Sequence, residues 1–307
     1  FTDQLDSFDV VILQNFDYKP YFERSPNALL ENLARFVREG GALVMVGGDR
    51  SFDLGDYAGT PIESVLPLDL GVMAAKSDEA RFRPELTAAG KKHPVTRLTG
   101  NAEDNSAAWS RLPMLDGMNR TMGPAQDAAV LLEHPSLNVA GQSMPVLAVR
   151  EVGKGRTMAL TVDASWRWSF SEAATGRGNQ AYLRFWKGAL RWLVADPDER
   201  RVVVRPSTEN LLLGEDVRLT SLVRDAGYSP LTDVPVQGWV ESPSGERSSF
   251  DVVTGESGEG VFGFTPTVAG AHRVHVSTPD GGDAETVFSV TTRDPELADI
   301  IPDAAFL

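Results

Sequence analysis

Polar and aromatic residues follow three apolar runs in the first two thirds of the sequence. They are Asp17 after the run 8–13, Asp49 and Arg50 after 42–46, and Asp163, Ser165, Trp166, Arg167 and Trp168 after 157–162. Carboxylates can act as general acids and bases, a guanidinium group can bind a carboxylate through two hydrogen bonds, and an indole can stack on a sugar or a peptide. These residue types fit either acid–base chemistry or the binding of a small carboxylate-bearing or sugar-like ligand.

The first two apolar runs belong to a pattern that is typical of parallel strands. The run 8–13 predicts a buried strand, and Ser25-Pro26 predicts the start of a helix, with serine as the N-cap and proline at the first helical position. Gly40-Gly41 ends this helix in the left-handed geometry that glycine tolerates. The run 42–46 then predicts the next buried strand. We therefore expect a strand–helix–strand unit.

A hairpin is predicted later in the chain, with strands at 146–152 and 157–162 and a turn at Gly153-Lys154-Gly155. In open α/β sheets the ligand crevice lies outside the carboxyl ends of the strands. We therefore expect Asp17, Asp49 and Asp163 to meet there, together with the neighbouring arginines and tryptophans. The alternative is that the aspartates cap helices or pair with arginines, while the tryptophans pack beneath the following helix.

The pattern changes near residue 200. Before it, an amphipathic helix is predicted over 180–194, with its inward face formed by Leu183, Trp186, Leu190 and Leu193. After it, only short alternating runs separated by turn residues occur. We predict a three-layer α/β domain with a mainly parallel sheet over 1–198 and a β-sandwich over 201–292. The segment 293–307 is expected to be a tail or a linker to a missing region, so the chain would be a piece of a longer protein.

Composition excludes several functions. The net charge of −14 repels nucleic-acid backbones, and no run of about 18 apolar residues is present to span a bilayer. The absence of cysteine excludes disulfides and cysteine-based zinc sites. His272 and His275 have odd spacing and would face opposite sides of one strand, whereas His93 and His134 precede prolines and suit exposed or capping positions. We therefore predict no metal and no cofactor.

One acidic loop leaves two interpretations open. Asp49, Asp53 and Asp56 lie within eight residues, which offers the oxygen ligands that calcium or magnesium prefers. Their spacing matches no EF-hand loop. We favour a solvated acidic loop without a bound ion.

Several segments together resemble the glutamine amidotransferase-like domains of large bacterial membrane-anchored proteins. They are 41–49 (Gly-Ala-Leu-Val-Met-Val-Gly-Gly-Asp), Ser51-Phe52, 55–61, His93-Pro94-Val95-Thr96-Arg97-Leu98, Gly155-Arg156, 163–168 and 185–193. The resemblance covers residues 5–200 and continues into the β-rich part. It implies a flavodoxin-like, class I glutamine amidotransferase-like fold followed by an immunoglobulin-like β-sandwich. It also implies flanking membrane segments outside this sequence and an extracytoplasmic (periplasmic) location.

The chain departs from a working amidotransferase at both catalytic positions. The resemblance places the nucleophilic cysteine on the turn after 42–46 and the base histidine after 157–162, where this chain has Asp49 and Asp163. Without a thiolate, attack on glutamine through cysteine is impossible. We therefore assign no catalytic residues.

Two functional hypotheses remain. The first is a catalytically inactive module that binds an unknown protein or small ligand in the bacterial cell envelope, with the membrane contacted only through segments outside this sequence. The second is a hydrolase that uses Asp49 and Asp163 in a carboxylate-based or metal-assisted mechanism. Geometry discriminates between them, because carboxyl groups in one open pocket favour the enzyme and carboxyl groups bound to amides and arginines favour the binding module.

Overall fold

The computed structural model describes residues 4–21, 26–71, 74–174, 178–196, 200–225 and 227–292. It divides into two compact units, Phe1–Arg200 with Ala226–Ser229, and Arg201–Asp225 with Pro230–Leu307. The segment 293–307, expected to be a tail, lies outside the described residues, as does Ser25, the expected N-cap. None of the helices within these ranges combines the length and the apolar character that crossing a bilayer requires.

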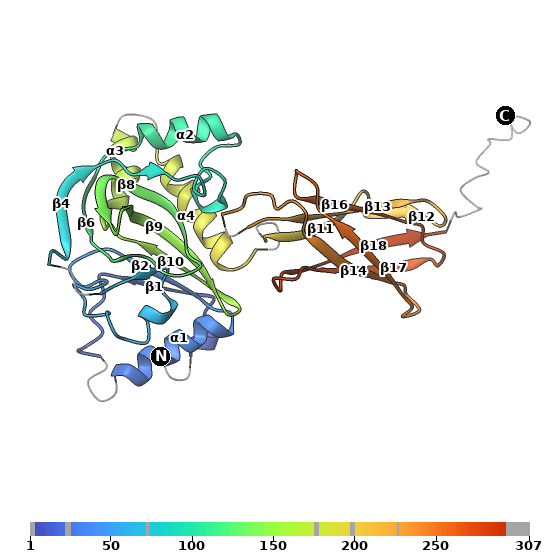
Figure 1. Ribbon diagram of the computed structural model, residues 1–307, viewed down its shortest axis with the longest axis horizontal. Helices are drawn as coiled ribbons and strands as arrows, with labels where there is room; N and C mark the ends of the chain where they lie inside the picture. Colours follow the sequence, from blue (N-terminus) through green and yellow to red (C-terminus); the bar gives the residue numbers. More distant parts are fainter. Residues whose placement is uncertain are drawn as a thin grey trace, which may run out of the picture. The chain divides into compact units, whose positions relative to one another are not determined.

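A six-stranded mixed sheet forms the centre of the first unit (Figure 1). Its order is β1 (Val10–Gln14), β2 (Ala42–Val46), β10 (Gly155–Leu160), β9 (Gln142–Val152), β8 (Ala129–Val139) and β5 (Glu85–Leu86). The predicted strand–helix–strand unit is confirmed, because β1 and β2 are parallel and α1 (Pro26–Glu39) joins them. The predicted hairpin is β9–β10.

The prediction of a mainly parallel sheet is wrong. β10 continues the parallel pairing of β1 and β2, but β9, β8 and β5 are antiparallel to their neighbours. The reason is local: the two-residue turn Ala140-Gly141, with φ of 49° and 81°, connects β8 directly to β9. A connection of this length can join only antiparallel strands, whereas parallel strands need a long crossover.

Helices cover both faces of this sheet. The side chains of β2 accordingly alternate between two apolar cores. Leu43 and Met45 pack in one core with Leu33 and Val37 of α1. Val44 packs in the other core, which receives α4 (Gln180–Leu193) and α2 (Ala102–Arg111). All five residues of β2 are buried, as expected for a central strand covered on both faces. The unit also contains α3 (Arg167–Ala174), short 3₁₀ turns, and two strand pairs, β3 (Leu68–Asp69) with β7 (Gly123–Pro124) and β4 (Ser77–Phe82) with β6 (Leu115–Asn119).

The helix at 180–194 is confirmed, but its inward face agrees with the prediction only in part: Leu193 is buried and Trp186 packs against the core as predicted, whereas Leu183 and Leu190 do not. Leu183 and Leu190 are exposed to 47% and 40%, whereas the buried residues of α4 are Phe185, Ala189, Trp192 and Leu193. Both faces carry apolar side chains, so hydrophobicity alone does not choose between them. Gly188 decides the orientation: a Cβ there would lie 2.9 Å from the carbonyl oxygen of Pro94, so only glycine allows this close approach.

His93 and His134 cap backbone turns, as one of the two alternatives predicted, but neither is solvent-exposed. His93 Nδ1 accepts a hydrogen bond from the Val95 amide at 3.2 Å, and His134 Nδ1 accepts from the Leu137 amide at 2.9 Å. The two residues are 1% and 4% exposed. Burial lowers the pKa of both imidazoles, that of His93 well below its usual range. Both rings are therefore neutral structural groups at neutral pH.

The second unit consists of two sheets that share one apolar core. Their orders are β11-β13-β16 and β12-β18-β17-β14-β15. The strands are β11 (Val202–Pro206), β12 (Asn210–Leu212), β13 (Val217–Val223), β14 (Pro235–Glu241), β15 (Arg247–Val253), β16 (Glu259–Phe264), β17 (Gly270–Ser277) and β18 (Asp283–Thr291). The expected short strands are confirmed, and residues 200–225 and 227–292 contain no helix. On β17, His272 is buried against Phe288 and His275 stacks on Trp239 on the other face, which confirms their opposite orientation.

Candidate functional site

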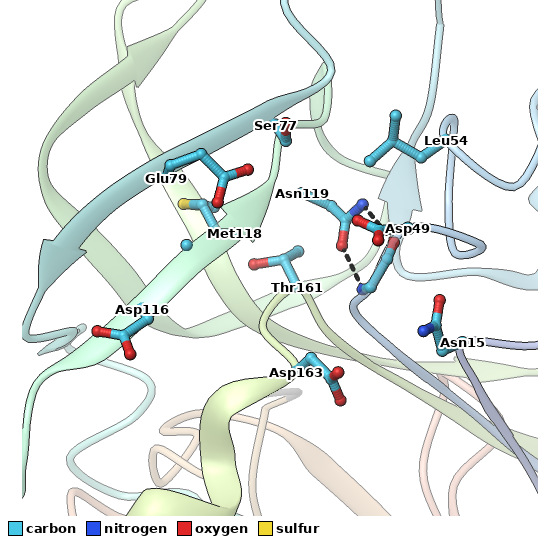
Figure 2. Close-up of a pocket in the computed structure, with 12 residues that line it drawn as sticks. Asn15, Asp49, Leu54, Ser77, Glu79, Asp116, Met118, Asn119, Thr161 and Asp163 are labelled. Atoms are coloured by element: carbon cyan, nitrogen blue, oxygen red, sulfur yellow. Dashed lines mark hydrogen bonds between the residues drawn. The ribbon is translucent and has the colours of Figure 1, made fainter.

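A pocket of about 150 Å³ lies at the carboxyl ends of β1, β2 and β10, next to the β4–β6 strand pair (Figure 2). It is lined by Asn15, Gly48, Asp49, Leu54, Ser77, Glu79, Asp116, Gly117, Met118, Asn119, Thr161 and Asp163. The position agrees with the general rule that open α/β sheets bind ligands outside the carboxyl ends of their strands. The volume is sufficient for a group of a few non-hydrogen atoms rather than for a large metabolite.

The turn after β2 is built from glycines because the chain passes very close to its neighbours. A Cβ on Gly47 would lie 2.5 Å from the carbonyl oxygen of Thr161, and a Cβ on Gly48 would lie 2.7 Å from Asn15 Oδ1. Gly48 also has a φ of +139°, a conformation that side chains rarely adopt. The most constrained residue of the turn therefore carries no side chain.

Two asparagines fix this turn. Asn119 is 4% exposed; its Oδ1 accepts a hydrogen bond from the Gly48 amide at 2.8 Å, and its Nδ2 donates to the Gly48 carbonyl at 3.0 Å. Asn15 Oδ1 accepts a hydrogen bond from the Arg50 amide at 2.7 Å. Neither residue is among the site residues predicted from the sequence. Asn15 directly follows a predicted strand and could have been found, but Asn119 comes from a segment without a clear strand pattern.

The pocket is strongly acidic. Its carboxyl groups are Asp49, Glu79, Asp116 and Asp163, and no lysine or arginine is among its lining residues. Asp116 is bound by Arg81 Nε at 2.7 Å and by Arg167, and Asp163 accepts a hydrogen bond from Gln14 Nε2 at 2.9 Å. Within the described parts of the chain, neither Asp49 nor Glu79 has an ion pair or a side-chain hydrogen bond.

The predicted crevice residues are only partly brought together. Asp49 and Asp163 line the pocket. Asp17 instead pairs with Arg50 outside it, and Arg167 forms an ion pair with the pocket residue Asp116. Ser165 is buried in the 3₁₀ turn Ala164–Trp166 that precedes α3.

The two tryptophans require a correction, because neither lines the pocket. Trp168 is 1% exposed and lies in the apolar core, where its ring makes edge contacts with Trp109 and Phe185 at centroid distances of 5.3 and 5.4 Å. Trp166 is 47% exposed, and the Arg167 guanidinium lies 5.1 Å from the centre of its ring. Residues two apart in a helical turn point in different directions, so the pair cannot form one aromatic floor.

The three aspartates of the acidic loop after β2 do not converge on one ion site. Asp53 is 7% exposed and pairs with Lys76 at 3.0 Å, and Asp56 pairs with Lys19. Asp49 turns to the pocket instead. Among the described residues, no group of three or more histidines and carboxylates has a geometry that could hold a metal ion.

Comparisons with known proteins give one family and several solved structures. The model of the family described as "Putative glutamine amidotransferase" matches residues 6–195. No curated protein matches the chain. Cytoplasmic protein STM3548 from Salmonella typhimurium is 22% identical over 62% of this chain and 74% of its own, with a TM-score of 0.48. Cytoplasmic protein STM1381 from Salmonella typhimurium LT2 is 20% identical over 63% and 76%, with a TM-score of 0.48.

Proposed function

The chain belongs to the Putative glutamine amidotransferase family, and from this membership and the site geometry we propose that it is a catalytically inactive module that binds a ligand at the acidic pocket. The main support is the turn after β2. In a working enzyme of this kind the turn would present a thiolate, whereas here it consists of Gly47 and Gly48 followed by Asp49, in a sequence without cysteine.

The acidic lining indicates which ligand the pocket would accept. Asp49 and Glu79 contribute two carboxylates with no ion pair or side-chain hydrogen bond in the described residues, and Asp116 and Asp163 also line the pocket. A cation would be attracted by this field and could receive several charge-assisted hydrogen bonds. The carboxylate-bearing ligand that the arginine–tryptophan pattern had suggested would be repelled. We therefore propose a small cationic group, such as the tip of an arginine or lysine side chain or a small amine.

The proposal extends to the setting of the module. We propose that the second unit is an immunoglobulin-like sandwich and that the module lies outside the cytoplasm of a bacterium, in a protein anchored by membrane segments beyond this sequence. The resemblance to membrane-anchored proteins supports this. Protease treatment of spheroplasts that express the full-length gene product tests it, since an extracytoplasmic module would be cut and a cytoplasmic one would be protected.

A hydrolase is the second candidate, because Asp49 and Asp163 line the same open pocket. One carboxyl group could act as a general acid and the other as a general base on a bound water molecule. We give it second place because Asp163 is held by Gln14 and no histidine is among the lining residues to activate Ser77, Thr161 or a water molecule. If it is correct, hydrolysis of some ester or amide substrate would be lost in both Asp49→Asn and Asp163→Asn.

We expect the purified protein to release no more ammonia from glutamine than the buffer blank does, because no thiol is available for attack. A coupled ammonia assay with an active glutaminase as the positive control measures this. Ammonia release that disappears in Asp49→Ala would overturn the proposal of an inactive module.

We expect methylguanidinium to bind to the pocket and its uncharged counterpart methylurea to bind far more weakly. NMR titration should show shifts at the Gly48 and Asn119 amides. Asp49→Asn and Glu79→Gln should each raise the dissociation constant roughly fivefold, because each removes one carboxylate worth on the order of 1 kcal/mol. Glu246→Gln, at an exposed turn of the second unit, is the matched control. Equal binding of the two probes would contradict the cation site.

A further inference from the structure

A second cavity, of about 550 Å³, opens in the first unit between β4, β5, α2 and the middle of β8. It is lined by the segment 80–86, by residues of α2 and by the segment 134–136. Its volume lies within the range of small-molecule sites. None of its lining residues belongs to the acidic pocket described above.

The inner wall of this cavity is apolar and rigid. Phe82 and Trp109 line it and are 4% and 2% exposed, so they are held by the core rather than free to collapse into the space. Trp109 Nε1 donates to the Thr96 carbonyl at 2.8 Å, which fixes the indole. Met114 lines the cavity and remains 43% exposed. A flat apolar body of the size of a bicyclic ring would bury this surface.

The rim of the cavity is cationic, although the chain as a whole carries a net charge of −14. Arg81, Arg83 and Lys91 line it, against the single carboxylate of Glu85. Arg81 is engaged with Asp116, and Arg83 uses only Nε, which donates to the Leu112 carbonyl at 2.9 Å. In the described residues the terminal nitrogens of Arg83 and the ammonium group of Lys91 have no ion pair. These groups can therefore receive an anion.

The lining of the cavity also includes a residue whose buried hydrogen-bond donor has no partner in the described part of the chain. His134 lines the cavity and is 4% exposed. Its Nδ1 accepts hydrogen bonds from the Ser136 and Leu137 amides at 3.1 and 2.9 Å, so in the neutral ring the proton is on Nε2. Nε2 is buried and has no hydrogen-bond partner among the residues that the structure describes. Such an orphaned donor is costly in a folded protein.

We propose that this cavity binds a small amphipathic anion, namely a carboxylate on a flat apolar body. The apolar body would contact Phe82, Trp109 and Met114, and the carboxylate would lie between Arg83 and Lys91. This site is separate from the acidic pocket in residues and in charge preference, so either proposal can fail without the other.

The test uses 2-naphthoate and its uncharged isostere 2-naphthamide, titrated into the whole chain by isothermal calorimetry. We expect 2-naphthoate to bind and 2-naphthamide to bind at least about tenfold more weakly, since it lacks the charge that the rim attracts. Raising the salt concentration should weaken the binding of 2-naphthoate, because the rim side chains are exposed. Equal affinities for the two compounds, or no binding of 2-naphthoate, would overturn the proposal.

Variants locate the site. Arg83→Glu with Lys91→Glu should abolish binding of 2-naphthoate, whereas Lys154→Glu, an exposed residue at the β9–β10 turn, should leave it unchanged. Ser110→Phe, at an exposed lining position of α2, should block the cavity without removing a core contact. Circular dichroism verifies that each variant is folded. Undiminished binding in both the double variant and Ser110→Phe would show that the anion binds elsewhere and would refute the assignment.

Discussion

Replacing Trp168 by alanine is expected to lower the free energy of unfolding of the first unit by about 3–5 kcal/mol. The side chain is 1% exposed, and its ring makes edge contacts with Trp109 and Phe185 in the core between the sheet and the helices. Alanine would leave a large cavity that these rigid neighbours cannot fill. Urea denaturation followed by far-ultraviolet circular dichroism measures the change.

The matched control lies two residues earlier. Trp166 is 47% exposed, and Trp166→Ala should cost no more than about 1 kcal/mol because nearly half of its surface is already in water and it lies outside the core. The loss of unfolding free energy in Trp168→Phe should lie between these two values, since phenylalanine keeps an aromatic ring in the core. If Trp166→Ala and Trp168→Ala cost the same, the burial assigned to Trp168 is wrong.

Replacing Asn119 by alanine is expected to destabilise the first unit by roughly 2–3 kcal/mol and to loosen the turn after β2. The side chain forms two hydrogen bonds to Gly48, at 2.8 and 3.0 Å, and alanine would leave the peptide N–H and C=O without these partners. Hydrogen exchange gives a local measurement. The Gly48 amide should exchange faster in the variant, and methylguanidinium binding should weaken with it.

Asn138→Ala is the control for this prediction. Asn138 is exposed, and its Nδ2 donates only to the Ser136 carbonyl, so its loss should change stability by no more than about 0.5 kcal/mol. An unchanged exchange rate of the Gly48 amide in Asn119→Ala would show that the turn is held by its glycine geometry alone.

Much of the secondary structure could be read from the sequence, because the signals are local. Pro26 and Gly40 bracket α1, the strand 42–46 is apolar throughout, and Gly153 with Gly155 marks the turn of a hairpin. Period-two alternation after residue 200 likewise identified the strands of the second unit. The absence of cysteine excluded thiol chemistry without any structure.

Only some residues of the candidate site could be predicted from the sequence. Asp49 and Asp163 follow strands whose carboxyl ends meet, so their shared pocket follows from the topology of parallel strands. Glu79, Asp116 and Asn119 come from β4 and β6, a strand pair whose pairing depends on contacts between distant segments. Nothing in the local sequence places that pair beside the end of the sheet, and so the acidic character of the pocket was missed.

By itself, the sequence determined where helices and strands form and which chemistry is impossible, because propensity, turn residues and residue types act locally. Only the tertiary structure decided which side chains face one another. The orientation of α4 depends on the close approach of Pro94 to Gly188. The burial of Trp168 and the exposure of Trp166 depend on which side of a helical turn meets the core. Such choices arise from packing between segments far apart in the chain, which leaves no periodic signal in either segment.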